Sequence, residues 1–545
     1  MPWLYDHILS LTIFLPMIFG LIVLAAPSLQ GAKIIAMLGA LVTFICTIWI
    51  WLNFDGSKSD LQFVESYTWI QDLGIRYIVG IDGLSLLLVV LTGFLTPLML
   101  LSLWKNSESN QKYFLSLFLF LECGMLGALL AFDLVFFYIF WEAMLIPMYF
   151  IIGIWGGKER IYAANKLFIY TVFGSLLLLV AAIVLYLEHF QQAGFYSTSL
   201  LDLYKIAPNL GEKQNWLFAA FALAFAIKVP IWPFHTWLPD AHVQAPTAGS
   251  VVLAGVLLKL GTYGFLRFAI PLFPAALVQF APILLGLGVI GILYGAFTAW
   301  VQQDAKKLVA YSSVSHLGFV VIGCVAIMAD KQLNIEALTG AVYQMINHGI
   351  STGALFFLVG VIYERRHTRM LADFGGLARV MPWFAVMLII ATMSSVGLPG
   401  TGGFVGEFLI LLGSFQASPL VAAFAVLGVL FGAVYMLTLC RRILFGPVTH
   451  TENEKLKDLS ALEFMYLTPL AILIVVMGIF PNFFLDKTKV SIEYLAKNYR
   501  SYELAIPTSS SPSTQSSEHT QDTESTGING QDDSQSGDGE STIDE

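Results

Sequence analysis

Charged residues are scarce in this sequence. Only 12% of its 545 residues are Asp, Glu, Lys or Arg, and 57% are hydrophobic. A typical soluble domain carries roughly a quarter charged residues. The mean hydropathy is +0.75, so water cannot be the main solvent. The composition therefore excludes an ordinary soluble protein, and we predict contact with the lipid bilayer and no nucleic-acid partner.

Cysteine pairs and nucleotide-binding motifs are also missing. The four cysteines are far apart, in or beside apolar runs, and form no CxxC motif: Cys46, Cys123, Cys324 and Cys440. There is no Walker loop and no dinucleotide fingerprint after a strand. His235 and His242 are seven positions apart with a proline between them, which fits neither helical ligation nor a zinc finger. We therefore predict no metal site and no redox cofactor in this chain.

Apolar runs long enough to cross a bilayer recur along the chain. About 20 apolar residues cover the hydrocarbon core as a helix. The pattern predicts an all-α polytopic membrane protein with about fourteen transmembrane helices. These spans lie near residues 8–26, 33–53, 79–104, 113–131, 133–155, 164–187, 215–239, 244–270, 276–300, 307–327, 336–362, 382–418, 420–440 and 461–481. Lys and Arg concentrate in alternate loops, above all in 365–379 and 441–457, which predicts that both termini face outward.

Titratable residues lie in the middle of several predicted spans. They are Glu122, Glu142, Lys228, Lys259, His316, His348 and Glu407. A charge at the bilayer centre costs about 2.5–3.5 kcal/mol on insertion scales. Each residue alone could be a paired structural ion or a packed histidine. Their shared depth favours a lateral line of groups that transfer protons through the bundle.

Lysine suits such a line for a physical reason. Desolvation disfavours a lysine's charged form, whereas a nearby carboxylate favours it. If Glu142 approaches and leaves Lys228, the lysine can alternately hold and release a proton. The sequence thus predicts that these two residues form a switchable ion pair.

Two predicted spans are interrupted near a charge. Pro230 and Pro233 follow Lys228 in span seven, and Gly397–Gly403 precedes Glu407 in span twelve. Pro230 and Pro399 are 169 positions apart, which suggests a duplicated five-helix unit. Because each unit has an odd number of spans, the copies would be inverted. Interrupted helices at matching positions point to an ion site near mid-bilayer, although simple kinks without transport are the alternative.

These observations predict five segments. Residues 1–112 hold helices 1–3, 113–270 the first inverted repeat with helices 4–8, and 276–440 the second with helices 9–13. Residues 441–500 hold the last helix and its flanks. The segment 501–545 is acidic, rich in Ser, Thr, Gly and Gln, and lacks Lys and Arg, so we predict a disordered acidic tail.

Several motifs in this chain resemble those of the antiporter-like membrane subunits of NADH–quinone oxidoreductase (complex I). They are Gly80–Leu86, Lys228–Pro230, His235–His242, Ala245–Ser250, Tyr311–Gly318, Gly397–Gly400 and Gly406–Phe408. The resemblance covers about residues 1–500. The same motifs also fit the related multisubunit Na⁺/H⁺ antiporters, which are the alternative. With an acid at position 407 the chain resembles the M branch of this family, because the paralogous subunits carry lysine at that position.

The resemblance implies a role for each buried group. Glu142 and Lys228 would form the input ion pair, and Lys259 would be the central lysine. His316 and His348 would connect it to Glu407, the terminal carrier. Glu122 joins the set as a proton-transfer candidate on its position alone. The resemblance further implies partner subunits that carry NADH, FMN, iron–sulfur clusters and quinone, neighbouring antiporter-like subunits, and the inner (plasma) membrane of a bacterium.

Overall fold

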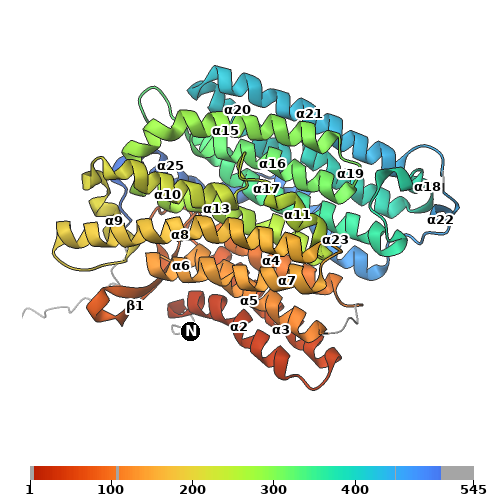
Figure 1. Cartoon of the computed structure of the whole chain (residues 1–545), viewed down its shortest axis with the longest axis horizontal. Helices are drawn as coiled ribbons and strands as arrows, with labels where there is room; N and C mark the ends of the chain where they lie inside the picture. Colours follow the sequence, from red (N-terminus) through yellow and green to blue (C-terminus); the bar gives the residue numbers. More distant parts are fainter. Residues whose placement is uncertain (1–4, 106–109, 449, 505–545) are drawn as a thin grey trace, which may run out of the picture. The chain divides into compact units, whose positions relative to one another are not determined.

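The computed structural model describes residues 5–105, 110–448 and 450–504. Long helices lie side by side in one bundle (Figure 1). The segments 1–4, 106–109 and 505–545 and residue 449 lie outside the described residues, and nearly all of the predicted acidic tail is among them.

Eleven helices in the described part of the chain are long and apolar enough to cross a membrane. They are α2 (Ile8–Ala25), α3 (Leu29–Asn53), α5 (Gln111–Leu130), α6–α7 (Leu134–Trp155), α8 (Arg160–Ala193), α12–α14 (Thr247–Leu272), α15 (Pro274–Trp300), α16 (Ala305–Cys324), α17 (Ile335–Arg366), α21 (Pro419–Leu444) and α23 (Ala461–Ile479). Shorter apolar helices are α4 (Leu86–Ser102), α19 (Pro382–Val396) and α20 (Gly402–Ala417). The polytopic α-helical class is confirmed, while the count of fourteen stays a prediction.

The structure contains a β-hairpin that the sequence analysis did not predict. Strands β1 (Gln62–Ile70) and β2 (Ile75–Ile81) pair antiparallel, and Gly74 ends the connecting turn with a φ of 64°. β-Branched and aromatic residues dominate β1 and favour a strand. The span expected from residue 79 therefore begins as a helix only at Leu86. The apolar end of β2 runs straight into that helix, which is why hydropathy alone merged them.

Both expected helix interruptions are present. Helix α10 (Lys213–Lys228) stops at Lys228, and α11 (Trp237–Gln244) resumes beyond Pro230 and Pro233. The second interruption separates α19 from α20 at Gly397 and Gly400, whose φ values are 78° and 90°. Both angles suit glycine alone, because a Cβ is strained there. The inverted repeats and the five-segment division stay predictions.

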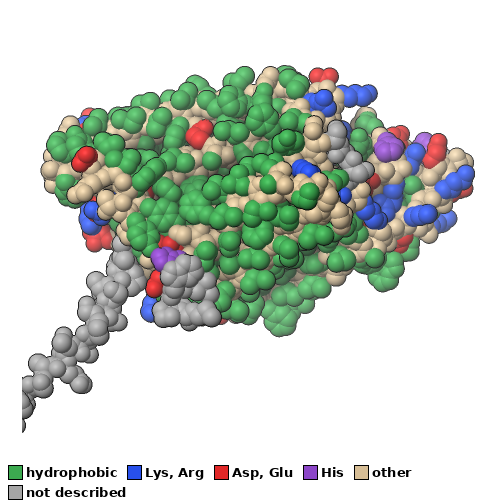
Figure 2. Space-filling model, turned by 90° about the horizontal axis from the view of Figure 1, so that it is seen from below, with side chains coloured by type: hydrophobic (Ala, Val, Ile, Leu, Met, Phe, Trp, Pro, Cys, Tyr) green, Lys and Arg blue, Asp and Glu red, His purple; other side chains and the backbone are tan. Residues whose placement is uncertain are grey.

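The centre of the bundle is formed by helices that are buried on all sides. The most apolar windows of α17 and α12–α14 are entirely buried, whereas those of α8, α21 and α23 are about one-third buried. Hydrophobic side chains cover most of the face in Figure 2, and Lys, Arg and His gather at one end. That end carries α18 (Leu377–Val380) and α22 (Thr451–Glu454), opposite the hairpin (Figure 1). We call these the basic end and the hairpin end. An apolar flank between polar ends fits a bilayer.

Candidate functional site

Lys259 lies at the centre of the bundle in an irregular stretch of helix. It belongs to α13 (Leu258–Gly264), which has a π-helical turn on each side, at Leu253–Leu257 and Phe265–Ala269. Such turns free backbone carbonyls and are frequent at functional sites. The fully buried Lys259 ammonium donates to the Ala254 carbonyl and to His348 Nδ1, the latter at 2.6 Å. A buried lysine thus has a direct titratable partner on α17.

His316 and Glu407 form a second close pair. His316 Nδ1 on α16 is 2.7 Å from Glu407 Oε1 on α20, and both side chains are only 6% exposed. Gln344 Nε2 donates to the same oxygen at 2.9 Å. The Tyr435 hydroxyl is 3.4 Å from His316 Nε2. Four helices therefore converge on one carboxylate and one imidazole.

The two pairs meet through their histidine rings. The centroids of His316 and His348 are 5.8 Å apart with an angle of 62° between the planes. Lysine can only donate, so neutral His348 accepts at Nδ1 and carries its proton on Nε2. An ionised Glu407 can only accept, so His316 donates from Nδ1. We call Lys259, His348, His316 and Glu407 the buried line. His348 Nε2 has no hydrogen-bond partner among the described residues, so the two pairs are joined by ring proximity and not by a hydrogen bond.

Glu142 and Lys228 are close, but they form no direct ion pair in the described structure. Lys228, which ends α10, is buried, and its ammonium lies 4.7 Å from the centroid of the Trp141 ring. Glu142 is half-buried and near enough to act on Lys228 electrostatically. Trp141 is fixed in turn by a 3.1 Å hydrogen bond from Nε1 to Ser175 Oγ. The lysine is thus held by an aromatic face rather than by the predicted carboxylate.

The space between Lys228 and the helix of Lys259 is almost closed. A cavity of about 10 Å³ touches Lys228, and Leu257 and Leu258 line its other side. One water needs roughly 10–15 Å³ of such volume and two or more polar partners. The first stretch of the predicted proton route is therefore nearly dry in this conformation.

Glu122 does not join the buried line. It is fully buried on α5, and neither carboxylate oxygen accepts a hydrogen bond from any described side chain, although Thr96 lies nearby. Its assignment to proton transfer stays a prediction.

Sequence reasoning missed three polar groups of the interior. Gln344 was passed over because its amide is uncharged and the search was for titratable residues in apolar runs. Arg267 lies in the apolar run of span eight, where its charge could have been noticed, and pairs with Asp82. Lys306 at the start of α16 is buried and donates to the Ala245 carbonyl at 2.5 Å.

A polar cavity of about 930 Å³ opens at the basic end. Lys306 and Thr247 line it, together with Asp304, Glu364 and Arg369. The cavity therefore reaches α12, the first turns of the helix that carries Lys259 farther along.

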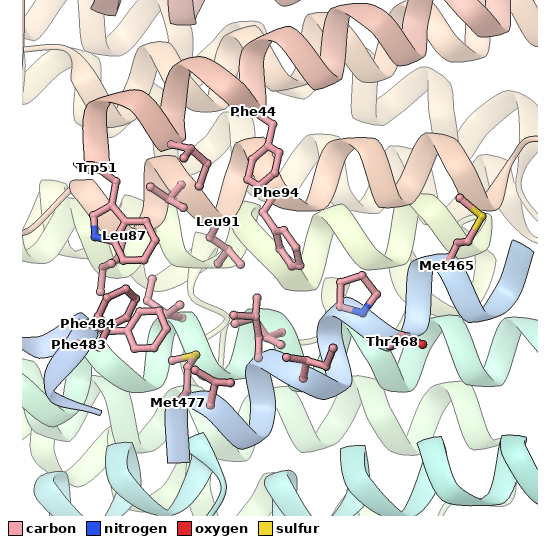
Figure 3. A pocket seen from close by; sticks show the side chains of 18 of the residues that line it. Phe44, Trp51, Leu87, Leu91, Phe94, Met465, Thr468, Met477, Phe483 and Phe484 are labelled. Carbon is pink, nitrogen blue, oxygen red and sulfur yellow. The ribbon is translucent and has the colours of Figure 1, made fainter. Parts of the chain in front are cut away.

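A second large pocket lies on the side of α17 that faces away from the buried line. This groove of about 770 Å³ runs along α23 against α3 and α4, and the polar groups in its lining are the Thr468 hydroxyl and the Trp51 indole N–H (Figure 3). Its floor on α17 is Ile346 and Ile350. Each is two residues from His348, about 200° around the helix. The groove thus faces away from the buried line and is not part of it.

A family profile and curated relatives both match this chain. The family profile described as NADH:quinone oxidoreductase/Mrp antiporter, TM matches residues 131–432. NADH-quinone oxidoreductase subunit M of Rickettsia prowazekii is 45% identical over 493 residues, covering 90% of this chain and 98% of that protein. The chain belongs to the subunit M family of NADH–quinone oxidoreductase. The Rhodobacter capsulatus subunit M is 44% identical over 512 residues, covering 91% and 97% of the two chains.

Solved structures agree with this membership. A chain of respiratory complex I from Thermus thermophilus superposes with a TM-score of 0.81 at 33% identity, covering 90% of this chain and 99% of its own. The Mrp complex of a Dietzia species has a chain with a TM-score of 0.79 at 20% identity, covering 90% of this chain and 98% of its own. That lower identity shows a shared fold alone. The subunit M family thus fits better than the antiporter alternative.

Proposed function

We propose that this subunit M-family chain translocates protons in the membrane arm of NADH–quinone oxidoreductase and carries no redox cofactor itself. NADH, FMN, iron–sulfur clusters and quinone belong to partner subunits in this proposal, and neighbouring antiporter-like subunits flank the chain. The relatives from Rickettsia and Rhodobacter support a bacterial inner membrane as its location. The observation that carries the proposal is the buried line, in which two directly bonded titratable pairs meet inside an apolar bundle.

The geometry supports a defined sequence of proton transfers. Lys259 passes a proton to His348 Nδ1, and the proton on His348 Nε2 leaves toward the facing ring of His316. His316 Nδ1 then protonates Glu407. The two bonded pairs lie within hydrogen-bond reach, the first requirement for an acid or base, whereas the step between the rings needs a bridging water or a small motion. Glu142 and Lys228 load Lys259 when the dry gap between the two lysines opens.

The helix interruption at Gly397–Gly400 lies beside Glu407, so a conformational change there can act on this acid. Gly397 lies against the carboxylate, since a Cβ added there would be 3.4 Å from Glu407 Oε2. A shift of the Gly397–Gly400 turn therefore changes the surroundings of the acid directly. Broken helices place ion sites beside mobile backbone in many transporters.

The proposal is tested by Lys259→Met in the assembled complex reconstituted into vesicles. NADH-driven proton uptake should fall at least about tenfold, because methionine cannot carry a proton. NADH oxidation by a soluble acceptor checks that the complex is intact. Lys205→Met is the matched control, because Lys205 forms an exposed pair with Asp202. Unchanged NADH-driven proton uptake in the Lys259→Met variant would refute the proposal.

A further inference from the structure

A buried ion pair outside the buried line closes the hairpin end of the bundle. Arg267 Nη2 is 2.5 Å from Asp82 Oδ1, and both side chains are completely buried. Arg267 is eight residues beyond Lys259 on the same helical stretch, about 12 Å along the axis. It thus lies between the central lysine and the hairpin end.

Segments from distant parts of the sequence cover this pair. Arg267 Nε donates to the Tyr263 hydroxyl at 3.0 Å, and its guanidinium carbon lies 4.6 Å from the Phe132 ring centroid. Tyr204 lies on the short helix α9 (Leu200–Ile206) at the hairpin end (Figure 1). Its hydroxyl donates to the Arg267 carbonyl at 2.7 Å. Tyr502 packs edge-on against Tyr204 with centroids 5.1 Å apart. Aromatic rings therefore cover the Asp82–Arg267 ion pair.

The two ends of the bundle differ in access. At the basic end, the polar cavity of about 930 Å³ reaches the helix of Lys259. At the hairpin end, the same helix is covered by a neutralised ion pair and rings. A buried ion pair is weak evidence of stability, because apolar residues of similar size often serve as well. Burial of the pair therefore does not by itself assign it a stabilising role.

We propose that Asp82 and Arg267 form a proton barrier that prevents exit at the hairpin end beside Lys259. This inference rests on the proposed function and deepens it. The arginine cannot release its proton, so no relay passes through it. Its guanidinium keeps the paired Asp82 carboxylate in the ionised form, so this acid is not free to carry a proton either. A proton on Lys259 is therefore left with the sideways route to His348.

The barrier predicts an asymmetry between the two partners. Arg267→Gln leaves a buried carboxylate that attracts and carries protons, whereas Asp82→Asn leaves the arginine, which cannot release its proton, in place. Both changes break the same ion pair, so a purely structural role predicts similar damage from each. The direction of the asymmetry thus separates a barrier from a structural support.

The experiment measures passive proton entry into vesicles that contain the assembled complex, without NADH and under an imposed potential. Arg267→Gln should raise proton leak about tenfold, while Asp82→Asn stays at the level of the unaltered protein. Arg365→Gln is the matched control, because Arg365 forms an ion pair with Glu463 at the basic end in which the two side chains are 16% and 9% exposed. Equal leak in the Arg267→Gln and Asp82→Asn variants, or no leak in either, overturns the barrier.

Two further measurements keep the outcome decisive. If Arg267→Gln does not assemble, Tyr263→Phe removes the hydroxyl that orients Arg267 and should raise leak about twofold, and an unchanged leak rejects the barrier. NADH-driven uptake in the Lys259→Met variant tests the proposed function separately. If pumping depends on Lys259 but the Arg267→Gln variant shows no added proton leak, the barrier is rejected and the proposed function stands.

Discussion

The two stretches of the predicted proton route differ in how their titratable groups touch. From Lys259 to Glu407, direct hydrogen bonds join both pairs, and two facing rings bridge them. From Glu142 to Lys259, an aromatic ring holds the lysine of α10, and the space beyond it is almost closed. In the proposed function, the first stretch is therefore the gate and the second is a preformed relay.

Physical chemistry explains why the gate belongs in the dry stretch. Proton transfer needs a hydrogen-bonded contact or a bridging water. The relay has the contact already, whereas Lys228 must leave Trp141 or receive water before it can pass a proton on. A small motion there changes transfer more than the same motion in the relay.

The largest predicted effect is on the relay. Glu407→Gln should lower NADH-driven proton uptake at least about tenfold, because the amide accepts no transferred proton. Proton uptake per NADH oxidised in vesicles is the measurement. Glu452→Gln is the control, since Glu452 is exposed and lies 3.8 Å from Arg366. If both variants pump equally well, the relay does not end at Glu407.

A change in packing next to His348 tests the rigidity of the relay. A Cβ on Gly349 would be 2.8 Å from the Gly255 carbonyl oxygen, so Gly349→Ala pushes α17 from the helix of Lys259. Overpacking of this kind costs about 1–3 kcal/mol of stability. The thermal midpoint of the complex and its proton uptake should both fall. Gly286→Ala, with nothing within 4 Å of the added carbon, should change neither.

The smallest predicted effect is on the gate. Trp141→Leu removes the ring face beside Lys228, an interaction of roughly 2 kcal/mol in a desolvated site. Without the ring the gate no longer holds Lys228 back between transfers, so protons leak back and net uptake per NADH should fall about threefold, while Trp141→Phe should retain most of it. Equal uptake in the leucine and phenylalanine variants would show that the ring face does not control Lys228.

The sequence predicted the members of the relay and missed their supports. Lys259, His316, His348 and Glu407 were recognisable because charge or imidazole in an apolar run is costly. The structure brings these four together across distant helices. Gln344 escaped notice because an amide in a helix resembles any surface glutamine in sequence.

The gate shows what sequence position leaves undetermined. Depth in the membrane predicted that Glu142 and Lys228 would pair, but depth does not define rotation about the helix axis. Trp141, one residue before Glu142, takes the place beside the lysine. The partner of Arg267 was hidden for a related reason, because Asp82 is 185 positions away and only the fold brings them into contact.

The central claim is tested most directly by the number of protons taken up per NADH in the His348→Phe variant. Phenylalanine fills the space of the imidazole but cannot accept from Lys259, so the account predicts a marked fall with normal assembly. His189→Phe is the matched control, a buried histidine whose Nδ1 is 3.0 Å from the Phe195 carbonyl, outside the buried line. An unchanged proton count in the His348 variant would contradict the account.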